Sequence, residues 1–274
     1  MALIHCEFFS DTLELSVGMY VILPQHTATH AHYHEGVRFD PPHPTLYLLH
    51  GLSDNHTGWV RRSSIERYAG EKNLAVVMPD AHRSFYTDMK NGHDYWTFIS
   101  RELPGICRKF FPLSDKREDN FVAGLSMGGY GAMKWALTYP EKFCAAASLS
   151  GAVDRTQRMA ASDKMTREFA NVFGAPEDYP GSENDLLHLA TRLAESSRPA
   201  PAMYQCCGTA DFVYPENVSF RDHLRGLGLP LDYHEHPSEE HEWGYWDRMI
   251  RDVIEWLPLR PDAGGGTGST PSAD

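Results

Sequence analysis

Five short apolar runs recur along the chain, and each ends at a glycine or a polar residue. They are TLYLLHG (45–51), LAVVMPD (74–80), NFVAG (120–124), FCAAASLSG (143–151) and PAMYQCCG (201–208). Runs of this kind are typical of strands buried on both faces, as in parallel sheets. Segments with helical spacing lie between them, at roughly 60–73, 94–111, 128–139, 215–227 and 244–257. This alternation predicts an α/β fold with a mostly parallel central sheet and helices on both faces.

Other stretches depart from this alternation. Residues 1–23 alternate polar and apolar positions around a turn at Ser10–Asp11, which predicts an antiparallel N-terminal hairpin at the sheet edge. Residues 152–200 contain charged, helix-prone pieces, and we interpret them as a small cap insertion over the strand tips. We therefore expect a single domain over residues 1–260. The remaining segment, 261–274 (PDAGGGTGSTPSAD), has the composition of a disordered tail.

The composition argues against some classes of binding partner. The formal net charge of the 274 residues is −12, which argues against binding to nucleic acid or to anionic membrane surfaces. The five cysteines follow no disulfide or zinc spacing. The first residues, MALIHCEFFSDTLEL, lack the basic and apolar regions of a secretory signal, and no apolar stretch approaches the roughly 20 residues of a membrane span. We expect a cytoplasmic protein.

A G-x-S-x-G motif spans residues 124–128. The motif predicts a nucleophilic serine when a strand precedes it and a helix follows it. NFVAG precedes it, and GGYGAMKWALTYP follows it with helical spacing. A serine in that turn projects its hydroxyl in front of a helix N-terminus, whose dipole favours a developing anion. Ser126 is therefore the predicted nucleophile.

A serine hydroxyl becomes reactive when a base takes its proton and an acid orients that base. When a G-x-S-x-G serine is followed along the chain first by the acid and then by the histidine, the histidine comes after the last core strands. His241 lies in the loop before the last predicted helix, whereas His234 and His236 fall within the strand-like LDYHEH. Asp211 follows the run that ends at Gly208, so it is the predicted acid. Two further carboxylates remain candidates for the acid. Asp154 is the main alternative, and the pattern places Asp232 within a strand.

Acyl transfer passes through a tetrahedral anion that needs hydrogen-bond donors. One expected donor is the backbone N–H of Met127, directly after the nucleophile. The other is expected after the early strand TLYLLH, where the N–H of Leu52 is the predicted donor. We expect Gly51 and Trp243 to lie against the bound substrate. No cofactor and no metal are expected.

Five sequence blocks together resemble one family. LLHGLSDNHTGW, PDAHRSFYTDM, GLSMGGYGAMKWAL, GTADFVYPEN and HEWGYWD, within about residues 1–258, resemble the tributyrin-esterase branch of the esterase D-like α/β-hydrolases. The resemblance implies an α/β-hydrolase fold, hydrolysis of short-chain carboxylic esters and a homo-oligomer. Its Ser–Asp–His triad corresponds to Ser126, Asp211 and His241.

Several alternatives stay open. Similar families include S-formylglutathione hydrolases, which are thioesterases, and feruloyl or acetyl esterases. The formylglutathione enzymes typically carry a cysteine after the oxyanion glycine, where this chain has Ser53-Asp54-Asn55-His56. The same triad also serves acyl transfer to an acceptor other than water. A non-catalytic binding module is the alternative of another class, and it usually lacks a triad residue. The His-rich loop 26–34 is interpreted as a solvated loop, with a metal site as its alternative.

Overall fold

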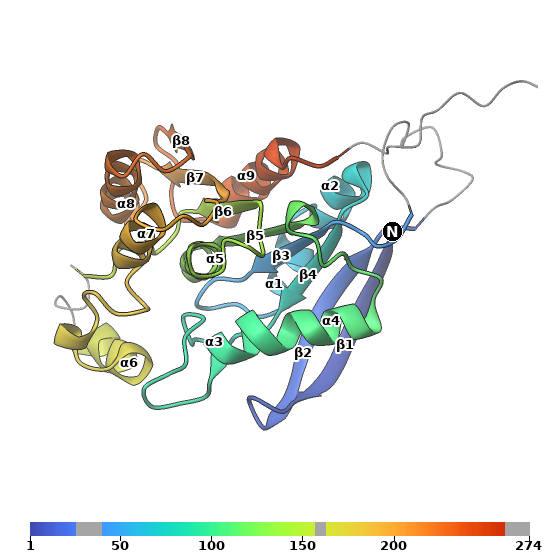
Figure 1. Cartoon of the computed structure of the whole chain (residues 1–274), viewed down its shortest axis with the longest axis horizontal. Coiled ribbons are helices and arrows are strands. Elements are labelled where there is room, and N and C mark those ends of the chain that lie inside the picture. The colour runs from blue at the N-terminus through green and yellow to red at the C-terminus, as the bar shows by residue number, and fades with distance from the viewer. Residues whose placement is uncertain (26–39, 157–162, 261–274) are drawn as a thin grey trace, which may run out of the picture.

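The computed structural model describes residues 1–25, 40–156 and 163–260, and of residues 163–167 only the backbone. Its centre is an eight-stranded sheet in the order β1-β2-β4-β3-β5-β6-β7-β8. The strands are β1 (Ala2–Ser10), β2 (Leu15–Leu23), β3 (Thr45–Leu49), β4 (Ala75–Pro79), β5 (Asn120–Leu125), β6 (Ala145–Leu149), β7 (Ala202–Gly208) and β8 (Leu231–His236). The N-terminal hairpin lies at one edge and β8 at the other (Figure 1).

The direction of the strands matches the sequence prediction. β1 pairs with β2 and β2 pairs with β4 in the antiparallel sense, whereas every pairing from β4 across to β8 is parallel. Both the predicted hairpin and the mostly parallel sheet are therefore confirmed. Because the strands from β3 to β8 run the same way, their carboxyl ends lie along one edge, where ligands bind in sheets of this type.

Helices cover both faces of the sheet. They are α1 (Gly58–Arg62), α2 (Ile65–Lys72), α3 (Tyr95–Thr97), α4 (Leu103–Phe110), α5 (Met127–Thr138), α6 (Asp163–Phe173), α7 (Leu186–Ala194), α8 (Tyr214–Gly226) and α9 (Trp243–Trp256). A short π-helix at Phe98–Glu102 joins α3 to α4, and short 3-10 helices lie at Arg117–Asp119 and Pro176–Asp178. Side chains of α4, α5, α7 and α8 pack with Tyr47 in one core cluster, and those of α2 and α9 pack with Leu46 in the other.

Burial explains why the sequence forms these strands. Every residue of β3, β4, β5 and β6 is buried, as a continuous apolar run requires when helices cover both faces. In β1, by contrast, exposed and half-buried residues alternate from Ala2 to Phe9, because only one face of this edge strand packs against the protein.

The predicted cap segment, residues 152–200, holds α6 and α7. α7 packs against α5 and α8, and the hydroxyl of Tyr130 on α5 donates to the carbonyl of Asn184 over 2.7 Å. On α6, the ring of Phe169 packs edge-on against Phe85 at 5.5 Å between centroids. The segment is thus held against the helices of one face of the sheet. The His-rich loop 26–34 and the predicted tail 261–274 lie outside the described residues.

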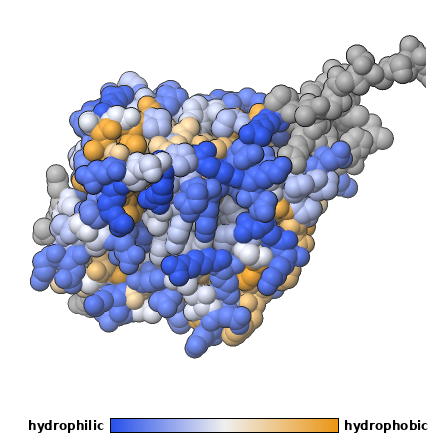
Figure 2. Space-filling view, in the orientation of Figure 1, coloured by the Kyte–Doolittle hydropathy of each residue, from blue (hydrophilic) through white to orange (hydrophobic). Residues whose placement is uncertain are grey.

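The surface in Figure 2 is mainly hydrophilic, and hydrophobic residues gather only in small separate areas of this face. Leu3, Phe9, Phe110 and Phe212 are the large hydrophobic residues with the most exposed surface in the described ranges. Within those same ranges, no helix combines the length and the apolar character that crossing a membrane would need.

Candidate active site

Ser126 occupies a sharp turn between the end of β5 and the start of α5. Its backbone has φ 52° and ψ −115°, and a positive φ is uncommon for a residue with a side chain. The turn excludes side chains at two positions. A Cβ at Gly124 would lie 2.3 Å from the carbonyl oxygen of Gly128, and a Cβ at Gly128 would lie 2.3 Å from that of Leu49. The two glycines of the motif thus allow the strand and the helix to meet at Ser126.

The side chains of Ser126, His241 and Asp211 form one hydrogen-bonded series. Nε2 of His241 lies 3.0 Å from Oγ of Ser126, and Nδ1 lies 2.8 Å from Oδ2 of Asp211. An ionised carboxylate only accepts hydrogen bonds, so Nδ1 carries the imidazole proton and Nε2 presents its lone pair to the serine hydroxyl. The structure therefore brings together the three residues that the sequence singled out, in a geometry suited to proton transfer from Ser126.

Loops at the carboxyl ends of neighbouring strands hold this series in place. Asp211 follows β7, and its fully buried carboxylate also accepts from the N–H of Val213 over 2.9 Å. His241 lies between β8 and α9, and its side chain is 17% exposed. The centre of its ring lies 4.4 Å from that of Phe212 and 4.8 Å from that of Trp246, with the His241 and Trp246 rings nearly perpendicular. The acid is thus enclosed, while the base remains within reach of water and substrate.

The alternative acid, Asp154, has other partners. Oδ2 of Asp154 accepts from the hydroxyl of Ser219 over 2.8 Å, and Oδ1 accepts from the backbone N–H of Thr156 over 3.2 Å. Both carboxylate oxygens are therefore engaged away from His241. The carboxylate that contacts the imidazole is Asp211.

The other carboxylate and histidines that the sequence left open lie on β8. Oδ1 of Asp232 lies 2.9 Å from Nε2 of His234, and both side chains are more than two-fifths exposed. His236 contacts the hydroxyl of Tyr245 through Nδ1 over 2.9 Å. These contacts belong to the sheet surface and the packing of α9, in keeping with the strand positions that the pattern predicts.

Two backbone N–H groups lie beside the nucleophile. Met127 is the first residue of α5, where the helix itself provides no acceptor. A Cβ placed on Gly51 would lie 3.7 Å from Cβ of Ser126, so the peptide that carries the Leu52 N–H passes close to the serine. Among the described residues, no hydrogen bond occupies the N–H of Leu52 or of Met127. Both groups are available to an oxygen atom above Ser126.

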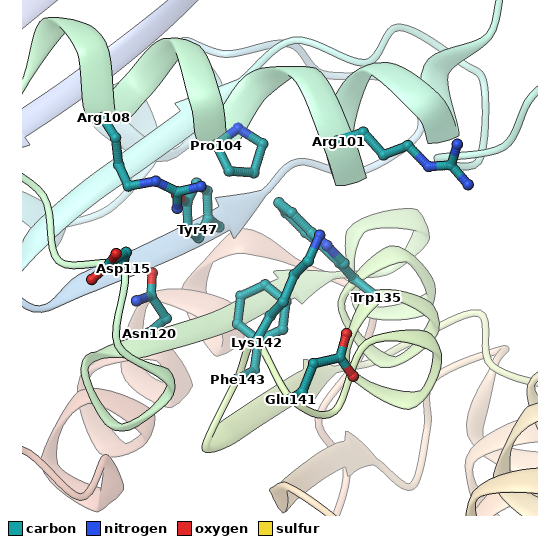
Figure 3. Close-up of a pocket in the computed structure, with 10 residues that line it drawn as sticks. All are labelled: Tyr47, Arg101, Pro104, Arg108, Asp115, Asn120, Trp135, Glu141, Lys142 and Phe143. Carbon is teal, nitrogen blue, oxygen red and sulfur yellow. The ribbon is translucent and has the colours of Figure 1, made fainter. Parts of the chain in front are cut away.

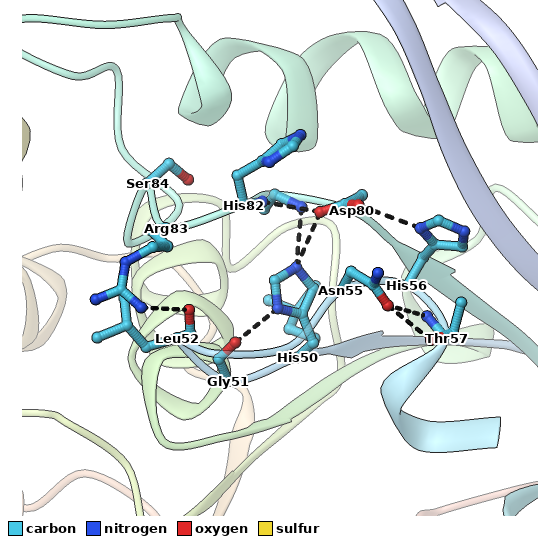
Figure 4. Close-up of polar contacts among 12 residues, drawn as sticks. His50, Gly51, Leu52, Asn55, His56, Thr57, Asp80, His82, Arg83 and Ser84 are labelled. Atoms are coloured by element: carbon cyan, nitrogen blue, oxygen red, sulfur yellow. Dashed lines mark hydrogen bonds and ion pairs between the residues drawn. The ribbon is translucent and has the colours of Figure 1, made fainter. Parts of the chain in front are cut away.

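Side chains hold the loop that carries Leu52 (Figure 4). His50 is buried, and its Nδ1 lies 2.8 Å from the carbonyl oxygen of Gly51. Nη1 of Arg83 donates to the carbonyl oxygen of Leu52 over 3.3 Å. The backbone of this loop is therefore fixed on both sides of the Leu52 N–H.

Asp80 lies behind this loop, between two imidazoles. Its Oδ1 lies 3.5 Å from Nε2 of His50, and its Oδ2 lies 3.2 Å from Nδ1 of His56. Burial opposes ionisation of Asp80, but its contacts with His50, His56 and the backbone N–H of His82 outweigh burial and hold its pKa well below the usual range. Asp80 is therefore a carboxylate at neutral pH.

Comparison with known proteins is consistent with this geometry. A family model, Esterase, described as "putative esterase", matches residues 10–256. The chain belongs to this esterase family. It is 31% identical over 265 residues to an acetyl esterase of Caldicellulosiruptor saccharolyticus, covering 94% of this chain and 98% of that one.

Two solved structures from Staphylococcus aureus are also similar to this esterase. One is a fluorophosphonate-binding serine hydrolase (TM-score 0.83), and the other is an S-formylglutathione hydrolase (TM-score 0.81). Each is 35% identical, and each match covers 93% of this chain and 98% of the other. The α/β-hydrolase fold and the membership in the esterase D-like family are thereby confirmed.

A cleft of about 680 Å³ opens beside Ser126 in this esterase. Gly51 and Trp243, which the sequence predicts to contact substrate, both line it. Its other lining residues are Leu52, Ser53, Asp54, Arg62, Leu125, Phe212, His241, Glu242, Gly244 and Trp246. The described part of residues 152–200 contributes no side chain to this lining. The described surface around Ser126 comes instead from the loops after β3, β7 and β8, the end of β5, and helices α1 and α9.

A second cavity of the esterase, of about 230 Å³, lies near the opposite ends of the strands (Figure 3). Asn120, the first residue of β5, lines it together with Tyr47, Trp135 and Arg108. The triad contributes nothing to this cavity, so it is separate from the cleft beside Ser126.

Sequence reasoning did not single out Phe212, Arg62 or Trp246, although all three line the cleft. Phe212 directly follows Asp211, and that adjacency is the signal that could have identified it. Arg62 and Trp246 enter the cleft from α1 and α9, and their side-chain directions depend on how these helices pack in the esterase.

Proposed function

We propose that this esterase hydrolyses short-chain carboxylic esters through an acyl-enzyme intermediate, with Ser126 as the nucleophile. The observation that carries the proposal is the continuous series from Asp211 through His241 to Ser126, at 2.8 Å and 3.0 Å. The series opens onto a cleft that a small ester can enter. The backbone N–H groups of Leu52 and Met127 lie beside the serine, and among the described residues no hydrogen bond occupies them.

In the first step, Oγ of Ser126 attacks the ester carbonyl carbon while its proton passes to Nε2 of His241. The carbonyl oxygen becomes an anion, and it accepts hydrogen bonds from the N–H groups of Leu52 and Met127. Asp211 stabilises the imidazolium that forms. The carbon–oxygen bond to the alcohol then breaks, and the alcohol leaves with the proton from His241.

In the second step, water takes the place of the alcohol. His241 accepts a proton from the water molecule as its oxygen attacks the acyl carbon, and the same two N–H groups hold the second oxyanion. Collapse of this intermediate releases the carboxylic acid, and the proton returns to Oγ of Ser126. The exposed fraction of His241, 17%, gives water access to the base.

The cleft favours a short acyl chain. The apolar side chains that the described residues bring to the cleft are Leu52, Leu125, Phe212, Trp243 and Trp246. The charged side chains of Asp54, Arg62 and Glu242 line the rest of the cleft, and a long alkyl chain would remove their water without replacing its hydrogen bonds. The acetyl-esterase relative and the resemblance to the tributyrin-esterase branch support the same range, from acetyl to butyryl esters.

The test is hydrolysis of p-nitrophenyl acetate, butyrate and octanoate, and of tributyrin, by the wild-type protein and Ser126→Ala. We expect turnover of the acetate and butyrate esters and of tributyrin, with a graded decline toward octanoate, since each methylene changes binding by only about 1–3 kcal/mol. Ser126→Ala should show no turnover and an unchanged unfolding temperature. Equal rates in both proteins would disprove the role of Ser126, and a preference for octanoate would disprove the short-chain proposal.

A thioesterase acting on S-formylglutathione is the second candidate, because a relative so named is 35% identical. Arg62 is an exposed cation at the cleft, with its guanidinium carbon 6.0 Å from the ring centre of Trp243, and a glutathione carboxylate would pair with it. We expect Arg62→Met to lower kcat/KM for S-formylglutathione selectively if this is the substrate. An equal effect on p-nitrophenyl acetate, or no effect, would exclude recognition of glutathione by Arg62.

We also propose that the protein acts in the cytoplasm. All five cysteines are free thiols in the structure, and cysteines stay reduced in that compartment. Fractionation of the source cells with activity or antibody detection tests this: recovery in the periplasmic or extracellular fraction would contradict it.

A further inference from the structure

Two histidines and a glutamate meet at the edge of the sheet, apart from the triad. His5 and Glu7 are two residues apart on β1 and therefore project from the same face of the strand. His56 comes from the loop between β3 and α1. One ligand atom of each residue lies within 4.8 Å of those of the other two, and Nε2 of His5 is 3.1 Å from Oε1 of Glu7.

The imidazole of His56 presents a lone pair to this cluster. Its Nδ1 lies 3.2 Å from Oδ2 of Asp80, and the other oxygen of that carboxylate, Oδ1, accepts from the backbone N–H of His82 over 2.9 Å. Because a carboxylate only accepts, Nδ1 carries the proton, and Nε2 of the neutral ring has its lone pair free. A carboxylate that holds the far nitrogen of a histidine in this way is the usual support of a metal-binding imidazole. Figure 4 shows the contact between His56 and Asp80.

Gly18 has no side chain, and the cluster occupies the space beside its backbone. It lies opposite Glu7 in the register of the hairpin. A Cβ at Gly18 would lie 2.9 Å from both Oε1 of Glu7 and Nε2 of His56. The carboxylate oxygen and the lone pair are thus neighbours over the backbone of Gly18. Two electron-rich atoms held together in this way are stabilised by a cation between them.

The ring of His5 is held over the same place. It stacks on His56 with 5.3 Å between centroids and 8° between planes, and on Tyr20 at 4.9 Å. The His5 and Glu7 side chains are 45% and 58% exposed, so both can turn without disturbing the core. The donors of a tetrahedral zinc ion lie roughly 3.3 Å apart, given metal–ligand bonds of about 2 Å. The ligand atoms of the three residues now lie within 4.8 Å of one another. Rotation of the His5 and Glu7 side chains would bring them to the spacing that zinc requires.

We propose that His5, Glu7 and His56 form a binding site for a divalent transition-metal ion, with Zn²⁺ as the best match. Two imidazoles and one carboxylate are a donor set that zinc prefers, whereas Ca²⁺ and Mg²⁺ prefer sites made of oxygen. Asp80 is the supporting residue behind His56. The ion would join the edge strand β1 to the loop between β3 and α1, and so stabilise the packing of the hairpin against the rest of the protein.

The test is calorimetric titration of the chelator-treated, full-length protein with Zn²⁺. The variants are His5→Ala and Glu7→Gln. The matched control is His234→Ala, because His234 also pairs with a carboxylate two residues away on an exposed strand, at 2.9 Å from Asp232, and the described residues place no third donor there. Any zinc bound by the histidines of segment 26–34 is common to all four proteins, so the comparison isolates the cluster.

We expect the wild type and His234→Ala to bind one equivalent of Zn²⁺ with similar affinity. His5→Ala and Glu7→Gln should bind this equivalent at least about tenfold more weakly. The same ion should raise the unfolding temperature of the first two proteins and not of the other two, since a ligand of the native state stabilises it. Equal affinity in all four proteins would place the zinc elsewhere. Absence of binding to the wild type would mean that a proton, and not a metal, neutralises the cluster. Either result would overturn the proposal.

Discussion

The ring of His50 directs the peptide group that joins Gly51 to Leu52. Its Nδ1 lies 2.8 Å from the carbonyl oxygen of Gly51, and since a carbonyl only accepts, Nδ1 carries the proton. The other ring nitrogen accepts from the backbone N–H of Ala81 over 3.0 Å. A trans peptide is planar, so its N–H points away from its carbonyl. By holding the Gly51 oxygen on one side, His50 sets the direction of the Leu52 N–H on the other.

Replacing His50 tests this positioning role. In His50→Ala the Gly51 carbonyl loses the shorter of its two hydrogen bonds and keeps the one from the backbone N–H of Asp54 at 3.1 Å. The Gly51–Leu52 peptide is then held less firmly, and we expect kcat to fall by about 10- to 100-fold, which is less than the 10²–10³ cost of removing an oxyanion donor outright. KM should change little, because the ester binds before the anion forms. Steady-state kinetics with p-nitrophenyl acetate measures both.

A conservative variant separates positioning from general loss of structure. In His50→Asn the side-chain amide can still donate to the Gly51 carbonyl, so we expect most of kcat to return. A rise in KM with kcat unchanged would contradict the positioning role. So would equal kcat values for the alanine and asparagine variants.

Asp211 and Asp154 should differ sharply in their effect on rate. Asp211→Asn keeps the size of the side chain but no longer stabilises the imidazolium, so kcat should fall by a factor on the order of 10³–10⁴. Asp154→Asn alters only contacts with Ser219 and Thr156, and we expect kcat within about threefold of the wild type. Both are measured on the same ester, and the reverse order would assign the acid to Asp154.

The sequence was sufficient to predict that Ser126, Asp211 and His241 lie together, because each of them follows a strand. In a parallel sheet the carboxyl ends of strands share one edge, so the loops that hold Ser126, Asp211 and His241 must meet there. The same reasoning located Gly51 and Leu52 after β3. Ser126 directly follows β5, whereas Asp211 and His241 lie further along the loops after β7 and β8, so the directions of their side chains are known only from the structure.

The cluster of His5, Glu7 and His56 lay beyond this reasoning. His56 is 49 residues from Glu7 in the sequence, and the contact depends on the hairpin register that sets Glu7 opposite Gly18. No short spacing signals such a site. The histidines that drew attention in the sequence, within 26–34, are grouped along the chain, whereas grouping in space depends on how the sheet pairs.

Gly128 should tolerate no side chain. A Cβ there would lie 2.3 Å from the carbonyl oxygen of Leu49, and relief of that clash requires movement of β3 against α5. We expect Gly128→Ala to lower the free energy of unfolding by about 3 kcal/mol or more, because overpacking usually costs about 1–3 kcal/mol and this clash is with backbone. Urea unfolding followed by circular dichroism measures the change.

Gly105 is the matched control for that substitution. It lies within α4, and a Cβ there would meet no atom within 4 Å. Gly105→Ala should raise stability by about 0.5–1 kcal/mol, because alanine loses less backbone entropy in a helix than glycine does. Similar losses of stability in both variants would show that the close approach of Gly128 to Leu49 is not the cause.

Lys134 on α5 is fully buried among polar groups. Its Nζ donates to Oδ1 of Asn184 over 2.7 Å, and to the carbonyl oxygen of Tyr86 and the hydroxyl of Thr87 over 3.2 Å each. It also lies 4.4 Å from the ring centre of Trp96. Burial outweighs the opposing effect of nearby acidic residues and lowers the pKa of Lys134 to about 7.

This lowered pKa makes stability depend on pH in a defined window. Between pH 7 and the unfolded lysine pKa of about 10.4, the unfolded chain holds a proton that the folded protein has lost. Unfolding then takes up a proton, so the free energy of unfolding rises as pH increases through this window, with a limit of about 1.4 kcal/mol per pH unit for one group. Below pH 7 both states carry the proton, and this dependence disappears.

Urea unfolding of the wild type and of Lys134→Met, at intervals from pH 6 to pH 9, isolates this contribution. Lys134→Met leaves the Asn184 oxygen without its donor, which lowers stability by the same amount at every pH. The difference between the two curves should therefore be flat up to about pH 7 and then rise in favour of the wild type. A difference that stays flat to pH 9 would mean that the three polar contacts and the Trp96 ring keep Lys134 charged in spite of its burial.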